Sequence, residues 1–161
     1  MRALVVTVST RAAAGVYPDR SGPVIVEALV GLGFDVEGPR VVPDGPEVRT
    51  ALEAAVADGV DVVLTTGGTG LSPTDRTPEH TAAVLDREVP GIADAVRLAG
   101  LQAGVPTAVL SRGLAGVADR TLVVNLPGSP GGVKDGLAVL GPLLVHAVEQ
   151  IHGGGDHGVT S

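Results

Sequence analysis

The sequence predicts an α/β fold: a three-layer sandwich with a mostly parallel central sheet and helices on both faces. Short runs rich in β-branched residues alternate along the chain with longer segments of helical periodicity. The short runs are continuously apolar, as in strands that are buried on both faces of a parallel sheet. Glycines and prolines stand where the helices would begin or end, which agrees with this alternation.

Five strands and five helices are expected in order along the chain. The expected strands are Ala3–Ser9, Asp35–Val42, Val60–Thr65, Thr107–Leu110 and Thr121–Asn125. The expected helices are Gly22–Leu32, Glu47–Ala57, Pro78–Leu85, Ile92–Ala103 and Val133–Ile151. Gly33 and Gly59 follow the first two helices, and glycine is the usual residue just past a helix end. Thr77-Pro78 predicts a helix start, with Thr77 as the N-cap and Pro78 at the first helical position.

The 161 residues suit one domain, which we place at residues 1–151. The segment 152–161 is rich in glycine and lacks apolar periodicity, so we expect a flexible C-terminal tail. A metal site formed by His152 and His157 is the alternative interpretation of this segment.

The composition argues against several classes of partner. Eleven basic residues stand against 18 acidic ones, and the net charge of −7 would repel a nucleic acid. The only aromatic residues are Tyr17 and Phe34, which disfavours a platform for stacking single-stranded nucleic acid. No apolar stretch approaches the roughly 20 residues of a membrane span. We therefore expect neither a nucleic-acid partner nor a membrane partner.

The chain contains no cysteine. This excludes disulfides, thiolate zinc sites and cysteine nucleophiles, and it suits a cytoplasmic protein.

Polar segments follow four of the predicted strands. In an open parallel sheet, ligands bind beyond the carboxyl ends of the strands, so these segments should converge on one edge. They are Ser9-Thr10-Arg11, Pro43-Asp44-Gly45, Thr66-Gly67-Gly68-Thr69-Gly70 and the loop from Asn125 to Gly132.

The loop from Thr66 to Gly70 contains three glycines between hydroxyl residues. Glycines let backbone amides approach a phosphate closely, and successive amides can form an anion-binding nest. A tight strand-to-helix turn without a ligand explains the same residues. The loop lacks the Gly-Lys-Ser/Thr ending of a P-loop, and Pro73 interrupts a Gly-x-Gly-x-x-Gly pattern.

Two carboxylates accompany these loops. Asp44 and Asp75 together could hold Mg²⁺, which takes oxygen ligands alongside substrate phosphates. Taken alone, each of them is more simply explained as a turn or loop residue, and spacing alone favours that explanation. Arg11 and Arg112 also follow predicted strands, where each could pair with a phosphate or lie on the surface.

The loop from Asn125 to Gly132 joins a buried strand to a long helix. Pro127 and Pro130 stiffen the loop, Gly128 permits unusual dihedral angles, and Ser129 supplies a hydroxyl. The free amides at the start of the helix suit a phosphate. A rigid connection is the alternative.

These motifs together resemble the molybdopterin adenylyltransferase family, whose domain is of the Mog/MoaB type. The resemblance starts from Thr65–Gly70, followed by Asp75 and Thr77-Pro78-Glu79, and covers 1–151 in the same order. Further matching blocks are Ser9-x-Arg11, Gly15-x-Tyr17-x-Asp19-Arg20-Ser21-Gly22, Val42-Pro43-Asp44, Leu110-Ser111-Arg112 and Asn125-Leu126-Pro127-Gly128.

The resemblance implies a homotrimer that transfers AMP from Mg-ATP to the terminal phosphate of molybdopterin and releases pyrophosphate. Asp44 and Asp75 would be the catalytic residues and would hold Mg²⁺. The nucleotide phosphates would bind the glycine loop, at Thr66, Gly67, Gly68, Thr69 and Gly70. Molybdopterin would contact Ser9, Arg11, Ser111, Asn125, Pro127, Gly128 and Ser129. A separate enzyme that inserts molybdate is a possible partner.

Two departures from the family pattern stand out. Thr10 occupies a position where many relatives carry Asp, and Gly131-Gly132 replaces longer or charged residues. The main alternative function is a molybdopterin-binding protein of the same fold that lacks catalysis.

Two further alternatives are weaker. In a nucleotide-hydrolysing domain of the competence-damage type, Leu would stand at Thr69 and a second Asp at Arg76. A flavodoxin-like electron carrier would need an aromatic side chain near the loops to stack on its flavin, and none is expected there.

Overall fold

The computed structural model describes residues 1–154, and it confirms the predicted three-layer α/β sandwich. A six-stranded sheet has the order β2-β1-β3-β6-β5-β4, and β5 is antiparallel to its neighbours. The strands are β1 Arg2–Val8, β2 Asp35–Val42, β3 Val62–Thr66, β4 Arg87–Glu88, β5 Ala115–Ala118 and β6 Thr121–Leu126. The helices are α1 Thr10–Ala13, α2 Gly22–Gly31, α3 Pro46–Ala57, α4 Thr77–Ala82, α5 Pro90–Gln102, the 3₁₀ helix η1 Pro106–Leu110, α6 Pro130–Leu140 and α7 Leu144–Ile151.

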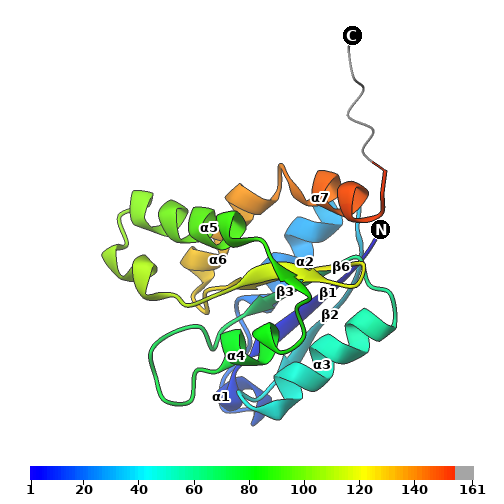
Figure 1. Cartoon of the computed structure of the whole chain (residues 1–161). Coiled ribbons are helices and arrows are strands. Elements are labelled where there is room, and N and C mark those ends of the chain that lie inside the picture. The colour runs from blue at the N-terminus through cyan, green and yellow to red at the C-terminus, as the bar shows by residue number, and fades with distance from the viewer. Residues whose placement is uncertain (155–161) are drawn as a thin grey trace.

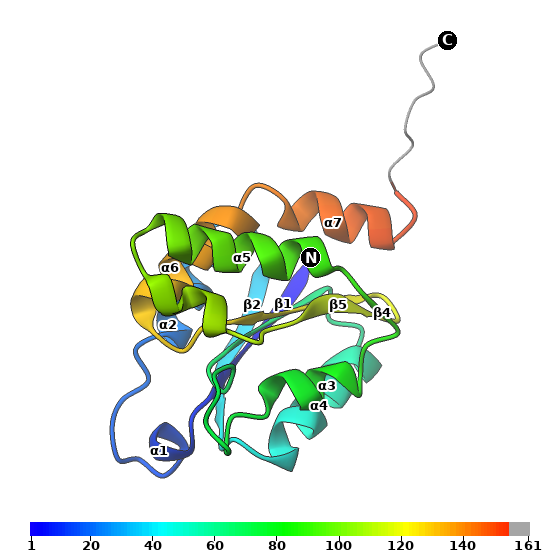
Figure 2. The same ribbon diagram turned by 60° about the vertical axis from the view of Figure 1, so that its left-hand side comes forward.

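Helices cover both faces of the sheet (Figures 1 and 2). Helices α2, α5, α6 and α7 pack on one face, where Ile25, Val96 and Val133 meet Val5 and Leu64 of the central strands. Helices α3 and α4 lie on the other face, and α3 contributes the buried apolar side chains that pack on β1, β3 and β6 there. Each central strand is therefore buried on both sides, which explains its continuous apolar sequence.

The predicted strand at Thr107–Leu110 is wrong, because these residues form most of η1. Pro106 begins this helix, and Val109 and Leu110 are about half exposed. None of the six strands of the sheet pairs with the segment. The sheet position is taken instead by β5, whose Ala-Gly-Val-Ala sequence has little intrinsic preference for strand. A Cβ on Gly116 would lie 2.5 Å from the carbonyl oxygen of Arg87 in β4, so the close pairing of the two strands requires this glycine.

The single helix expected over Val133–Ile151 is also wrong. The chain forms α6 and α7, which are bent by 59° at the break that contains Gly141 and Pro142. Proline has no N–H to continue the helical hydrogen bonds, which explains the break. No single helix among residues 1–154 is long and apolar enough to cross a membrane; the bent pair passes by length and composition, and its Val133, Leu140 and Val148 are buried against the sheet.

The predicted glycine caps are confirmed, whereas the predicted threonine cap is not. Gly33 and Gly59 have φ angles of +90° and +71°, as expected past helix ends. Thr77 is the first residue of α4 rather than its N-cap, which is Arg76. The Thr77 hydroxyl donates to the carbonyl of Gly67 at 3.0 Å, so it binds the glycine loop instead of the helix end.

The predicted tail begins at His152, which follows α7 directly. Its Nε2 lies 3.2 Å from a carboxylate oxygen of Asp61 and 3.3 Å from the carbonyl of Arg120. The rest of that prediction, including His157, concerns residues 155–161, which lie outside the described part of the chain.

Candidate functional site

The four polar segments converge at one edge of the sheet, as predicted. The Thr66 hydroxyl at the end of β3 donates to the carbonyl of Pro127 after β6 at 2.6 Å. The backbone N–H of Asp44, after β2, donates to the hydroxyl of Thr10, after β1, at 3.2 Å. The Ser21 hydroxyl before α2 donates to the carbonyl of Gly128 at 2.8 Å. Hydrogen bonds therefore join parts of the chain that are far apart in sequence into one rim.

Two adjoining pockets open along this rim. The first has a volume of about 780 Å³, and its polar lining includes Arg11, Tyr17, Asp19, Arg20 and Asp44. The second, of about 900 Å³, lies against α5, η1 and the start of α6. Residues that line both pockets are Gly68, Asp75 and Gly128. The pockets thus meet where the two glycine loops approach each other.

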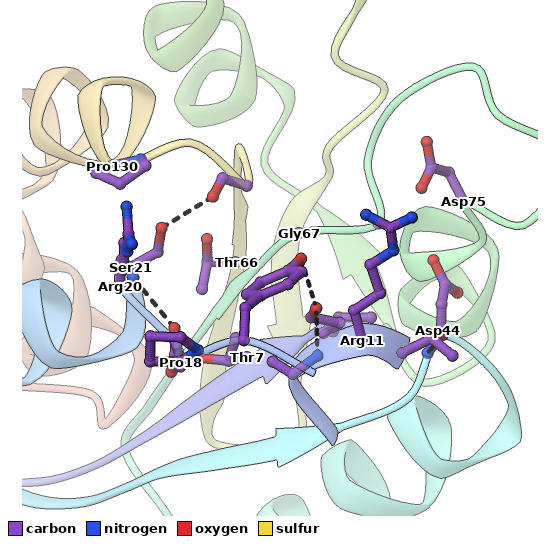
Figure 3. Close-up of a pocket in the computed structure, with 18 of the residues that line it drawn as sticks. Thr7, Arg11, Pro18, Arg20, Ser21, Asp44, Thr66, Gly67, Asp75 and Pro130 are labelled. Atoms are coloured by element: carbon purple, nitrogen blue, oxygen red, sulfur yellow. Dashed lines mark hydrogen bonds between the residues drawn. The ribbon is translucent and has the colours of Figure 1, made fainter. Parts of the chain in front are cut away.

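Figure 3 shows two groups of polar side chains that line the first pocket, with Thr66 and Gly67 between them. Arg11, Asp44 and Asp75 lie on one side, and Arg20 and Ser21 lie on the other with Pro130.

The first glycine loop requires its glycines because other chain segments lie against it. Gly67 and Gly68 have φ angles of +94° and +65°, which L side chains rarely adopt. A Cβ on Gly67 would lie 2.2 Å from the carbonyl oxygen of Val8, and one on Gly68 would lie 2.6 Å from a carboxylate oxygen of Asp44. Thr66 and Gly67 line the first pocket and Thr69 and Gly70 the second, so the loop forms the wall between the two.

Asp44 and Asp75 are brought together in the first pocket. Burial is the main cause that raises the pKa of the Asp44 carboxyl; the N–H of Arg76, 3.2 Å away, lowers it, and the charge of Asp75 raises it. The Asp75 carboxylate accepts the N–H of Ser72 at 3.2 Å. A cation would relieve the repulsion between the two carboxylates, so these residues fit Mg²⁺. Within residues 1–154 no group of three or more His, Cys, Asp or Glu side chains is placed to hold a metal ion.

Asp44→Asn is expected to raise the melting temperature at neutral pH in the absence of divalent cations. Since the folded-state pKa of Asp44 lies above its unfolded value, its charged form disfavours folding. This penalty is absent below the unfolded pKa and develops as the pH rises through the folded pKa. Thermal melts in EDTA should therefore show a gain at pH 7 that disappears near pH 3. A variant that is less stable than wild type at pH 7 would contradict this account.

Arg112 holds the segment that carries Asp75. Its backbone N–H donates to the carbonyl of Thr69 at 2.8 Å, its Nε to that of Gly70 at 2.9 Å, and its Nη2 to that of Asp75 at 2.7 Å. Its Nη1 pairs with Glu79 on α4. The guanidinium is therefore engaged by the protein itself, which assigns it to positioning the loop instead of binding a phosphate.

Arg112→Lys should lower kcat for the adenylyl transfer that the family resemblance implies by about 10- to 100-fold. One ammonium cannot reproduce the two hydrogen bonds by which the guanidinium holds Gly70 and Asp75. Small displacements of groups near the reacting atoms slow a reaction strongly. Glu79→Gln is the matched control, since it breaks the half-exposed ion pair but leaves both carbonyl bonds. Its effect on kcat should stay below about threefold. Equal losses in the two variants would show that the ion pair matters and the two carbonyl bonds do not.

The second glycine loop ends as a helix cap. The Ser129 hydroxyl accepts the N–H of Gly132 at 3.1 Å and so caps α6. A Cβ on Gly132 would lie 2.9 Å from that hydroxyl oxygen. A residue larger than glycine would therefore crowd this cap, which explains why Gly132 departs from the family pattern. Gly131 has open space around its Cα. Ser129, Gly131 and Gly132 line the second pocket together with Pro127.

Asn125 lies apart from both pockets, contrary to the expected molybdopterin contact. Its side chain is 2% exposed, and its amide nitrogen donates to the hydroxyls of Thr65 and Thr81 at 2.9 and 3.0 Å. Its side-chain oxygen accepts the N–H of Leu114 at 3.0 Å. These bonds satisfy its side chain inside the core, so we assign it to joining β6, β3 and α4.

The remaining expected molybdopterin contacts are divided between the pockets. Ser9 and Arg11 line the first, whereas Ser111 lines the second and donates to the hydroxyl of Thr69 at 3.3 Å.

Several lining residues were not predicted as site residues, among them Tyr17 and Arg20 in the first pocket and Arg97 and Lys134 in the second. The Tyr17–Arg20 segment belonged to a quoted family block, which was the available signal. The expectation that no aromatic side chain lies near the loops is wrong, because Tyr17 does.

Comparisons with known proteins identify the family of the chain. Residues 4–146 match the family described as probable molybdopterin binding domain. The chain is 44% identical to the molybdenum cofactor biosynthesis bifunctional protein of Synechococcus elongatus over 98% of this chain and 49% of that protein. It is 37% identical to the molybdopterin adenylyltransferase of Escherichia coli K12 over 92% of this chain and 80% of that enzyme. The chain thus spans about half the length of the bifunctional relatives.

A solved structure of MogA superposes with a TM-score of 0.92 at 61% identity, covering 94% of this chain and 99% of the other. The sequence matches and the fold match therefore indicate the same family. The chain belongs to the family of molybdopterin-binding domains that includes the Mog and MoaB proteins.

Proposed function

We propose that this chain transfers AMP from Mg-ATP to molybdopterin. Relatives that carry the name molybdopterin adenylyltransferase are 35–43% identical to it. The observation that carries the proposal is that the two pockets meet at Gly68, Asp75 and Gly128. Two substrates bound side by side would bring their reacting phosphates to this junction.

The first pocket suits the nucleotide. Arg11 and Arg20 supply positive charge, and the amide of Gly68 can approach phosphate oxygens closely. Asp44 and Asp75 would hold Mg²⁺, which when bound neutralises charge on the phosphates. We therefore propose Ser9 and Arg11 as nucleotide contacts, in place of the molybdopterin contacts that the family resemblance implied.

The second pocket suits the pterin. The apolar side chains of Val96, Val105 and Leu110 line it along α5 and η1, and such side chains fit a flat heterocycle. Ser111 and Ser129 supply hydroxyls, and Lys134 supplies a positive charge. Pro127 and the cap of α6 also line this pocket, and Gly128 lies at the junction, where the terminal phosphate of molybdopterin would sit.

The reaction is a substitution at phosphorus. An oxygen of the molybdopterin phosphate forms a bond to the α-phosphorus of ATP. The bond from that phosphorus to the oxygen that bridges to the β-phosphorus breaks, and pyrophosphate leaves with the electron pair. The residues of the chain contribute by orienting both phosphates and by stabilising the negative charge through amides and arginines.

A homotrimer, a molybdate-inserting partner and a cytoplasmic location remain predictions. Static light scattering of the purified chain tests the first, and a mass near the 16.0 kDa of one chain would contradict it. The chain covers 49% of the first bifunctional relative, so the proposal concerns only the function of the shared part.

The activity is tested by measuring pyrophosphate release from ATP and Mg²⁺ with and without molybdopterin. We expect release only when molybdopterin is present. A chain that binds molybdopterin tightly yet releases no pyrophosphate would favour the alternative, a binding protein without catalysis.

A further inference from the structure

Tyr17 is the exposed aromatic side chain of this protein. The chain has one tyrosine, one phenylalanine and no tryptophan; Phe34 is 5% exposed in the core, whereas Tyr17 is 46% exposed. Tyr17 also lines the first pocket, on the segment between α1 and α2. A partly exposed aromatic ring that lines a pocket is thus the exception in a sequence with few such rings.

The ring is anchored at its polar end. The Tyr17 hydroxyl lies 3.1 Å from the hydroxyl oxygen of Ser9, which follows β1 directly. Ser9 is itself held in place, because its hydroxyl oxygen accepts the N–H of Ala12 at 3.1 Å as the N-cap of α1. The backbone leading to the ring turns at Gly15, whose φ is +74°. The bond to Ser9 uses the single polar atom of the side chain, and the 46% exposure of the residue leaves part of it accessible to a ligand.

The first pocket contains two chemically different kinds of lining: cationic groups and the aromatic ring of Tyr17. Arg11, Arg20 and the amide of Gly68 provide positive and hydrogen-bonding groups for phosphates. Phosphate groups gain nothing from an aromatic face, whereas a nucleobase stacks on it favourably. The ring therefore serves a different part of a ligand from the part that the arginines serve.

We propose that Tyr17 forms a nucleobase subsite, with its ring stacked on the purine base of the nucleotide whose phosphates lie at the glycine loop. The identity of the nucleotide as ATP rests on the proposed function. The subsite makes Tyr17 a specificity-determining residue for a nucleotide over inorganic polyphosphate.

The composition makes this subsite directly observable. Because Tyr17 is the only tyrosine and tryptophan is absent, tyrosine emission from the whole chain reports on this ring alone. We expect ATP, added without molybdopterin, to quench this emission with saturation, and inorganic triphosphate to bind without quenching. Emission of N-acetyltyrosinamide at the same ATP concentrations corrects for light absorbed by adenine.

Three other outcomes would overturn the subsite. Calorimetry that detects ATP binding while tyrosine emission stays constant would place the base elsewhere and leave the proposed function standing. Equal quenching by ATP and by triphosphate would assign the signal to the phosphates. Absence of any ATP binding would remove the subsite and the proposed function together.

Two substitutions separate the ring from its hydroxyl. Tyr17→Leu should raise the KM for ATP by about tenfold or more, in line with the loss of one stacked base. Tyr17→Phe keeps the ring and should raise it by less than about threefold, and neither should alter the KM for molybdopterin. Equal increases in both variants would show that the bond to Ser9, and not stacking, supports nucleotide binding.

Discussion

Asp75→Asn should lower kcat for adenylyl transfer by about a thousandfold, since it removes a charged ligand of the Mg²⁺ that would neutralise the reacting phosphates. Asp75 lines both pockets at their junction, so its carboxylate lies where the two phosphates would react. The amide has nearly the same shape but no charge. Its side-chain oxygen can still accept the N–H of Ser72, so the loop should keep its conformation. Steady-state turnover and a thermal melt measure the two effects separately.

Asp35→Asn is a matched control for the loss of a carboxylate. Asp35 is exposed at the first residue of β2, at the edge of the sheet opposite the pockets. We expect the kcat of the Asp35→Asn variant to stay near that of wild type. If Asp75→Asn retained more than a tenth of wild-type kcat, the carboxylate would not be part of the reacting centre.

Gly67→Ala should destabilise the fold by about 3 kcal/mol, the sum expected from a positive φ and an overpacked contact. The new Cβ would lie 2.2 Å from the carbonyl oxygen of Val8, a backbone atom that cannot move without disturbing β1. Gly67 is also held on both sides, because its N–H donates to Leu126 and its carbonyl accepts from Thr77. For a domain of this size the melting temperature should fall by about 10 °C.

Two further glycines separate the causes. Gly33→Ala meets the same positive φ, at +90°, but finds nothing within 4 Å, so it should show the backbone strain alone. Gly31→Ala, the last residue of α2, has equally open space without a positive φ and should be neutral or slightly stabilising. A Gly67→Ala variant that melts within about 2 °C of Gly33→Ala would show that the clash with Val8 is relieved without cost.

The parallel part of the fold is predictable because its signals are local. Strands such as Val62–Thr66 are buried on both faces, and this alone produces a continuous apolar run. The antiparallel edge gives no such signal. Strand β5 consists of Ala and Gly with one Val, and its pairing depends on the close approach of Arg87. By contrast, Thr107–Leu110 resembles a strand but has no neighbouring strand to pair with.

The same distinction applies to the site. Asp44 and Asp75 follow from the rule that loops after parallel strands share an edge, and the structure brings them into one pocket. Asn125 satisfies the same rule, yet its side chain points into the core, where two threonine hydroxyls bind it. The direction of a side chain depends on tertiary partners that sequence position does not reveal. For this reason the positioning role of Arg112 becomes visible only in the structure, where it binds the carbonyls of Gly70 and Asp75. The place of Tyr17 in the first pocket is likewise known only from the structure.

The transfer itself is tested most directly with ATP labelled at one phosphorus. Purified chain is incubated with molybdopterin, Mg²⁺ and either α-³²P-ATP or γ-³²P-ATP, and the pterin product is separated by chromatography. The proposed mechanism predicts that the α-label appears in the pterin product and the γ-label in pyrophosphate. Transfer of the γ-label to molybdopterin, or an unlabelled pterin in both reactions, would contradict adenylyl transfer by this chain.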